Sequence, residues 1–246
     1  MTELEGRGLL VLLNDIEHRW RREYEIWHSR EHVPERLSVP GMTSARRYVR
    51  LDGSLPKHLT LYAMRDLSVL DGAPYQKLLN TPTDWSRRMR PAFRNVRRMG
   101  GTRITTRGGG MGGLLVAMTL DDMRFFDAPD ALRALEELPR LPGFTAMHLV
   151  RADPSVAKVP FTLGGKLPDG DLAGMILIES CDNTLLIEAL PSLASTLTAY
   201  APDAVSSLTT YALAMALSAC GLDRLTPPGL IRVNSGETGT KDDIRQ

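Results

Sequence analysis

Residues 39–43 read VPGMT, and residues 141–145 read LPGFT. Each stretch follows a segment of helical character and opens a run typical of a β-strand, SARRYVRLD after the first and AMHLVRADP after the second. Proline and glycine together interrupt regular structure and mark a corner of the chain. The return of the same corner roughly 100 residues later indicates that a small structural unit occurs twice.

The segments around the two corners also correspond. Residues 8–13 (GLLVLL) and 113–118 (GLLVAM) are short apolar runs that suit a buried first strand. The sequence then predicts third strands, helices and fourth strands in both halves, at 58–65, 69–79 and 95–105 and again at 172–179, 185–200 and 207–217. Each half therefore has the order β-α-β-β-α-β of a ferredoxin-like unit. A sheet covered on one face only leaves its other face bare, so we expect the two sheets to close an intramolecular α+β barrel.

The expected boundaries follow from composition. A first repeat spans residues 1–106, a glycine-rich linker 107–113, and a second repeat 114–233. The linker lacks the Lys-Ser/Thr pair of a phosphate-binding loop and precedes a strand instead of a helix, so a flexible joint is favoured. The polar residues 234–246 are expected to form a disordered tail.

Composition limits the classes of partner. The 246 residues are 43% hydrophobic and 24% charged with a net charge of +1, which is ordinary for a globular protein and does not favour nucleic acid. The sequence has neither a long apolar run nor a basic leader, so we expect a cytoplasmic protein without a membrane span. Cys181 and Cys220 lie in apolar contexts and are predicted to be buried, reduced thiols.

One segment carries most of the functional signal. Residues 27–37 read WHSREHVPERL and contain H-x-x-E-H, a spacing found in zinc hydrolases. A helical wheel at about 100° per residue places Ile26, Val33 and Leu37 on the core face, with Tyr24 and His28 roughly opposite. Pro34 predicts that the helix ends near His32.

Three interpretations of the two histidines remain open. In the first, His28 and His32 bind zinc and Glu31 acts as a base, but nothing downstream marks a third ligand. In the second, His28 is a solvated side chain and His32 satisfies carbonyl groups at the helix end. In the third, His32 faces a pocket as an acid or base, oriented by Glu31 or Glu35.

The WHSREHVPERL segment, the VPG corner and the later NTPTDWSRR (80–88) with Phe93-Arg-Asn95 resemble the dimeric α+β barrel proteins, particularly the EthD-like group. The resemblance implies the fold for this chain. The superfamily includes cofactor-free monooxygenases, isomerases, cyclases and haem enzymes, so it implies function only broadly. In several members the histidine equivalent to His32 lines the cavity. The second half keeps the topology but lacks the histidine motif.

The sequence therefore predicts a small-molecule enzyme that needs neither metal nor organic cofactor. It would act on an aromatic or apolar acid or ketone and move a proton, as a lyase, isomerase or cyclase does. A cofactor-free monooxygenase and a non-catalytic binding protein are the alternatives, and pairing into a homodimer stays open. His148 is a second acid/base candidate or a satisfied core histidine. The predicted catalytic residues are His32, Tyr62 and His28, and the predicted ligand-binding residues are Trp27, Tyr24, Trp85, Arg88 and Tyr48, with Tyr48 expected beside Tyr62.

Overall fold

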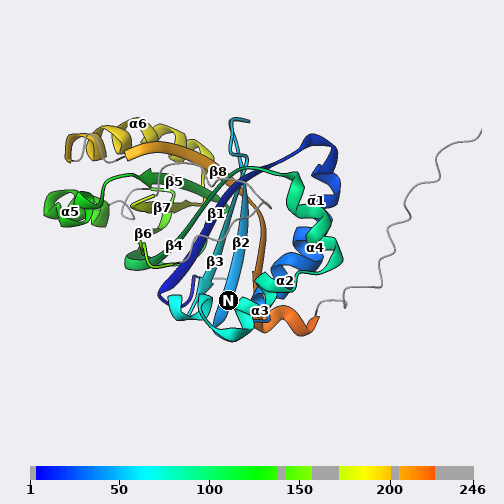
Figure 1. Ribbon diagram of the computed structural model, residues 1–246. Helices are drawn as coiled ribbons and strands as arrows, with labels where there is room; N and C mark the ends of the chain where they lie inside the picture. The colour runs from blue at the N-terminus through cyan, green and yellow to red at the C-terminus, as the bar shows by residue number, and fades with distance from the viewer. Residues whose placement is uncertain (1–3, 138–141, 157–171, 201–204, 225–246) are drawn as a thin grey trace, which may run out of the picture.

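A computed structural model describes residues 4–137, 142–156, 172–200 and 205–224. Its centre is a closed barrel of antiparallel strands in the order β1-β3-β2-β8-β5-β7-β6-β4 (Figure 1). The strands are β1 (Gly8–Ile16), β2 (Met42–Arg50), β3 (His58–Met64), β4 (Phe93–Gly108), β5 (Leu114–Leu120), β6 (Phe144–Ala152), β7 (Gly174–Ser180) and β8 (Val205–Ser218).

The barrel consists of two equivalent sheets. The first half contributes β4-β1-β3-β2 and the second half β8-β5-β7-β6, which is the ferredoxin-like strand order in each case. The sheets join where β2 pairs with β8 and where β4 pairs with β6. The prediction of two βαββαβ repeats forming an α+β barrel within one chain is confirmed. The barrel closes without a second copy.

Helices cover the outer face of each sheet on opposite sides of the barrel (Figure 1). The first half carries η1 (His18–Trp20), α1 (Arg21–Trp27), η2 (His28–His32), α2 (Val33–Leu37), η3 (Leu67–Leu70), α3 (Ala73–Asn80), α4 (Asp84–Met89) and η4 (Arg90–Ala92). The second half carries η5 (Met123–Asp127), α5 (Pro129–Glu137), α6 (Asn183–Tyr200) and η7 (Ala219–Arg224). No helix among the described residues is long and apolar enough to cross a membrane.

The two Pro-Gly corners have the same backbone geometry. Gly41 has φ +96° and Gly143 has φ +82°, in the left-handed region that side chains rarely adopt. Their positions directly before β2 and β6 explain why the repeated sequence contains glycine at both points. The corner identified from sequence is therefore a conformational requirement of the fold.

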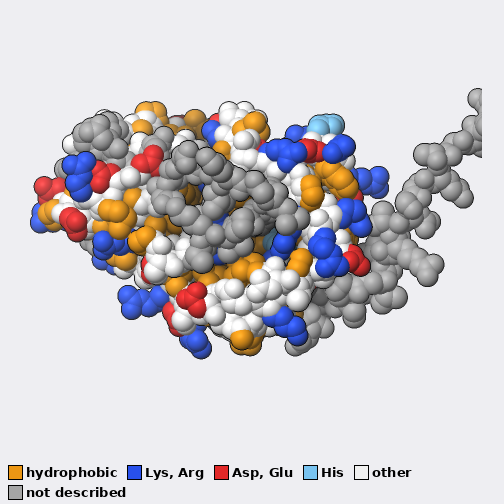
Figure 2. Space-filling view, in the orientation of Figure 1, with side chains coloured by type: hydrophobic (Ala, Val, Ile, Leu, Met, Phe, Trp, Pro, Cys, Tyr) orange, Lys and Arg blue, Asp and Glu red, His pale blue; other side chains and the backbone are white. Residues whose placement is uncertain are grey.

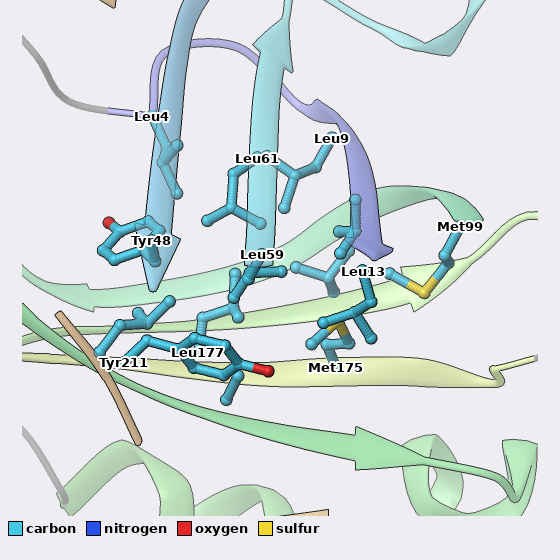
Figure 3. Close-up of a cluster of buried hydrophobic side chains, with 14 of the residues drawn as sticks. Leu4, Leu9, Leu13, Tyr48, Leu59, Leu61, Met99, Met175, Leu177 and Tyr211 are labelled. Carbon is cyan, nitrogen blue, oxygen red and sulfur yellow. The ribbon is translucent and has the colours of Figure 1, made fainter. Parts of the chain in front are cut away.

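The inward-facing side chains of both sheets form one apolar core. Leu59 and Leu61 of β3 meet Met175 and Leu177 of β7 in the barrel interior, where Tyr48 and Tyr211 also lie (Figure 3). Alternation along β3 therefore directs Leu59, Leu61 and Ala63 inward, and directs His58, Thr60 and Tyr62 toward the helices. Tyr48 and Tyr62 lie on opposite faces of the sheet, so the predicted proximity of the two tyrosines is wrong.

A buried ionic network links the two halves inside the barrel. Arg46 of β2 donates from Nη1 to Oε1 of Glu179 on β7 at 2.7 Å. The other carboxylate oxygen of Glu179 accepts the backbone N–H of Gly112 at 2.8 Å, and Oε1 also lies 3.1 Å from Nε2 of His148. Both side chains of the ion pair are 1% exposed, so the pair is fully removed from water.

Two surface features complete the description. Acidic and basic side chains are interspersed over the face seen in Figure 2, without a field of one sign. Cys181 and Cys220 are free and exposed, so the prediction that they are buried is wrong. Both follow the end of a strand, where apolar neighbours in the sequence do not imply burial. The predicted tail, residues 234–246, lies outside the described residues.

Candidate active site beneath the first helix

The histidine motif lies in a widened turn of a continuous helical segment. Residues His28–His32 form a π-helical turn between α1 and α2, and the N–H of Val33 bonds to the carbonyl of His28 five residues earlier. Pro34 lies in the first turn of α2, directly after the π turn. The prediction that the helix ends near His32 is therefore wrong, because the π turn accommodates the proline. Such turns occur frequently at functional sites.

The polar face of this helix is the buried one. Tyr24, Trp27, His28 and His32 are each at most 5% exposed, and Glu31 is 9% exposed. The wheel that placed Tyr24 and His28 away from the core is wrong, as is the interpretation of His28 as a solvated side chain. The sheet face beneath the helix carries polar side chains, so the polar stripe packs inward together with Val33 and Leu37.

Glu31 supports Trp27 and, among the described residues, makes no hydrogen bond to either histidine. Its Oε1 accepts hydrogen bonds from Trp27 Nε1 at 3.2 Å, Thr83 Oγ1 at 2.6 Å and Ser86 Oγ at 3.3 Å. Thr83 also caps α4 by accepting the N–H of Ser86 at 3.0 Å. The network fixes the indole of Trp27 against the imidazole of His32, with ring centroids 4.4 Å apart. Trp27 is therefore a positioning residue for His32.

A small cavity lies between the first sheet and its helices. Its volume is about 30 Å³, enough for one or two water molecules. It is lined by residues from β1, β3, β4, η2, α2 and α3, namely Leu10, Leu12, His32, Arg36, Tyr62, Tyr75, Leu79 and Arg98. A larger ligand fits only if some of these lining side chains move. Two predicted catalytic residues, His32 and Tyr62, are thus brought together at one cavity.

The environment sets the protonation state of these two groups. Burial, followed by the charge of Arg36, holds the pKa of His32 well below its ordinary value, so the imidazole is neutral at pH 7. Its Nδ1 is buried and has no hydrogen-bond partner among the described residues. Burial raises the pKa of Tyr62, so its buried and equally unpartnered hydroxyl keeps its proton. The pair offers a neutral base and a neutral hydrogen-bond donor.

The remaining predicted residues lie in three places. Tyr24 and His28 are beside His32 on the same buried helix face, with His28 and His32 ring centroids 5.5 Å apart. Trp85 and Arg88 both bond to Glu23, Trp85 at 2.9 Å and Arg88 through Nη2 at 2.6 Å, at the helix surface and outside the cavity lining. Tyr48 lies in the barrel interior.

The second half offers no matching arrangement among its described residues. His148 is engaged on both ring nitrogens, by Glu179 and by Thr106 Oγ1 at 3.0 Å, so it is a satisfied core histidine. The outer face of that sheet packs against α5 and α6 through apolar side chains such as Met118, Ile176 and Leu186. The candidate site therefore belongs to the first half, where the histidine motif lies.

Metal and haem are poorly matched by the described residues. Among them, no group of three or more His, Cys, Asp or Glu side chains is placed to hold a metal ion. Both ring nitrogens of His148 are engaged, so this histidine has no free nitrogen to ligate haem iron.

The chain is similar to known proteins in its fold and not detectably in its sequence. No protein-family model and no curated protein sequence matches the chain. An anthrone oxidase-like protein superposes with a TM-score of 0.59 at 15% identity, over 88% of this chain and 95% of that one. A variant chlorite dismutase from Candidatus Nitrospira defluvii, in complex with cyanide, gives 0.53 at 13% identity, over 90% and 94%. The chain has the dimeric α+β barrel fold.

A candidate monooxygenase from Fusobacterium nucleatum subsp. nucleatum shares the fold as well, with a TM-score of 0.52 at 8% identity over 87% of this chain and 95% of that one. At such low identities the similarities establish the architecture of this dimeric α+β barrel protein and leave its reaction open. The narrower resemblance to the EthD-like group stays a prediction.

Sequence reasoning missed several residues of the cavity. Arg36 follows His32 by four residues, so helical spacing alone places the two side chains on neighbouring positions. Leu10 and Leu12 alternate along β1 and share the face of Tyr62, which the strand register also pairs with Leu10. Tyr75 and Arg98 come from α3 and β4, and no spacing in the sequence connects them to the histidine motif.

Proposed function

We propose that the chain is a small-molecule enzyme in which His32 removes a proton from a weakly acidic C–H or O–H group of an apolar ligand. The observation that carries the proposal is the placement of a neutral, buried imidazole at a cavity beside a protonated tyrosine. The lowered pKa keeps His32 unprotonated at neutral pH but also makes it a weaker base than a free imidazole, so proton removal depends on stabilisation of the anion that forms. Burial of both groups also strengthens every electrostatic interaction within the cavity.

The charge that develops on the ligand has two stabilising groups nearby. The hydroxyl of Tyr62 can donate a hydrogen bond to an enolate or phenolate oxygen. It has no hydrogen-bond partner among the described residues, so its hydrogen is available. Arg36 contributes a permanent positive charge at the cavity wall. Its Nη1 lies 3.5 Å from Glu35 Oε2 in an ion pair, so the carboxylate offsets part of this charge. Proton removal is therefore accompanied by stabilisation of the anion.

The fate of the anion divides two reaction classes. Return of the proton at another position gives an isomerisation, cyclisation or elimination. Reaction of the carbanion with O₂ gives a cofactor-free oxygenation, and the likeness to an anthrone oxidase-like protein and a candidate monooxygenase favours this second candidate. Both classes need the same first step at His32, so the assignment of the base does not depend on the choice.

Anthrone provides one compound that tests both classes. Its methylene group is weakly acidic, and its oxidation is balanced as anthrone + O₂ → anthraquinone + H₂O. Under nitrogen in D₂O, we expect the protein to accelerate exchange of the methylene hydrogens, as measured by NMR. In air, oxygen uptake above the protein-free rate selects the oxygenase. The exchange assay is repeated with a smaller 1,3-diketone, in case the cavity beside His32 does not admit anthrone. Failure to accelerate exchange or oxidation of either compound contradicts the proposal for C–H acids.

A further inference from the structure

Beyond His32, the space between helix and sheet contains a second group of polar side chains. On β3, His58 and Thr60 share the outer face with Tyr62, and Asn14 of β1 pairs with His58 in the strand register. Arg47 of β2 pairs with Thr60. These residues lie next to the cavity because Leu12, which lines it, is the register partner of Thr60.

The helix completes this group from above. The ring of Tyr24 lies 4.9 Å from His58 and 5.1 Å from His28, measured between centroids. The guanidinium carbon of Arg47 lies 5.5 Å over the Tyr24 ring. His28 in turn lies 5.5 Å from His32, so buried rings run without interruption from the cavity to His58. We name this group the polar compartment; its members are Asn14, Tyr24, His28, Arg47, His58 and Thr60.

The polar compartment is under-satisfied. Buried polar atoms of every member make no hydrogen bond of good geometry to the described residues, although the Tyr24 hydroxyl interacts weakly with Asn14 and Arg47: Asn14 Oδ1, Tyr24 OH, both ring nitrogens of His28, Arg47 Nε and Nη1, His58 Nδ1 and Thr60 Oγ1. Buried polar groups in folded proteins are nearly always paired, because an unpaired one costs the free energy of its desolvation. So many in one place indicate that a bound molecule supplies the missing partners.

The charge of the polar compartment selects the kind of molecule. Arg47 uses Nη2 in an ion pair with the half-exposed Glu25, which leaves its buried Nε and Nη1 hydrogens without acceptors. Burial and then the charge of Arg47 lower the pKa of His28 and bring that of His58 to about 4, so both imidazoles are neutral at pH 7. The permanent charge is thus one guanidinium shared with one carboxylate, which suits a monoanion better than a dianion such as phosphate.

We infer that the polar compartment binds the carboxylate of a ligand whose apolar part lies in the cavity beside His32. The inference rests on the proposed function for the place of the apolar part, and it narrows the substrate class to carboxylic acids. A carboxylate has two oxygens able to accept hydrogens from Arg47, Tyr24 and Thr60. His28 then lies between the bound carboxylate and His32. The hydrogen that His32 removes is therefore on a ligand atom some distance from the carboxylate.

Acetate and acetamide test this inference, since they have nearly the same shape and differ in charge. Long-range ¹H–¹⁵N spectra of the histidine rings are recorded at pH 7 and constant ionic strength while each compound is added. Acetate is expected to shift the His28 and His58 signals along a saturating curve, with a Kd at least ten-fold lower than that of acetamide. Equal Kd values for the two compounds, or acetate shifts confined to the exposed His18, would overturn the inference.

Matched variants locate the binding. Tyr24→Phe and Thr60→Val each remove one hydroxyl and keep the shape, and each is expected to raise the Kd of acetate about 3- to 10-fold. Tyr48→Phe removes an equally buried hydroxyl on the other face of the sheet, and is expected to leave the Kd unchanged. The same Kd in Tyr24→Phe and Tyr48→Phe would contradict the assignment. Acetate binding is expected to survive in His32→Gln, so loss of turnover there does not bear on this inference.

Discussion

The imidazole of His32 lies against the indole of Trp27, with ring centroids 4.4 Å apart and an angle of 36° between the planes. Trp27 is itself anchored by Glu31, which also accepts hydrogen bonds from Thr83 and Ser86 at the start of α4. The orientation of the candidate base therefore depends on a carboxylate that is hydrogen-bonded to its neighbour Trp27. The helix α4 is thus connected to the site even though none of its residues lines the cavity.

Glu31→Gln is expected to weaken this support. The amide keeps one acceptor oxygen but turns an N–H₂ group toward donors, so we expect the free energy of unfolding to fall by about 1 to 3 kcal/mol. The rate of anthrone exchange is expected to fall as well, while a pH–rate profile keeps its shape because the base itself is unchanged. Urea unfolding and the exchange assay measure the two effects. Glu188→Gln on the exposed face of α6 is the control, and an equal loss there would contradict the role of Glu31.

Tyr62→Phe tests whether the hydroxyl of Tyr62 has a catalytic or a structural role. The hydroxyl is buried without a partner among the described residues, so its removal is expected to leave the free energy of unfolding unchanged or higher by up to about 1 kcal/mol. The exchange rate is expected to fall roughly 10-fold or more, because the developing oxyanion loses its donor. Tyr48→Phe, in the barrel interior, is expected to keep full activity. A less stable Tyr62→Phe protein with normal activity would assign the hydroxyl a structural role.

The buried histidines are expected to make the fold sensitive to mild acid. The folded pKa of His58 is about 4, below its ordinary 6.5, so the unfolded chain binds the proton more readily. Its stabilising contribution is complete above pH 6.5 and declines as the pH falls toward 4, by on the order of 3 kcal/mol in total. His28 and His32 act in the same direction. Urea unfolding at several pH values checks this, and His58→Gln is expected to reduce the slope where the exposed His18→Gln does not.

The ion pair between Arg46 and Glu179 is expected to hold the two sheets together. Burial alone would raise the pKa of Glu179, but the hydrogen bond from His148 and the charge of Arg46 keep it below its ordinary value. Arg46→Met leaves a buried carboxylate without its cation and is expected to cost roughly 3 to 5 kcal/mol in urea unfolding. The double variant Arg46→Met with Glu179→Met is expected to lose less free energy of unfolding than the sum of the losses in the two single variants. Additive losses would show that the two side chains do not interact.

Sequence patterns predicted the barrel well because its determinants are local. Both halves show the same strand alternation, Pro-Gly corner and order of elements. The pattern in one half therefore supports the prediction for the other. The orientation of the histidine helix could not be predicted in the same way. The wheel assumed one regular helix, whereas the π turn at His28–His32 advances by less than about 100° per residue and re-phases everything after it.

The membership of the site depends on contacts that sequence does not record. His32 and Tyr62 were identified from their chemistry, and the structure places both at one cavity. Arg88 was predicted to bind the ligand, but it is engaged by Glu23 from a different helix, a pairing between residues far apart in the chain. Arg47 and Thr60 lie in two strands whose sequences contain no functional motif. The pairing of β2 with β3 places them together beneath Tyr24.

The exchange of anthrone in D₂O under nitrogen, compared between the unaltered protein and His32→Gln, tests the role of His32 most directly. Glutamine fills a similar volume and cannot take the proton, and general bases contribute about 10²- to 10⁴-fold to such reactions. The account predicts a loss of at least about 100-fold in His32→Gln, with the unaltered rate kept in His18→Gln at the exposed surface. Equal exchange rates in the unaltered protein and His32→Gln, with both proteins folded, would contradict it.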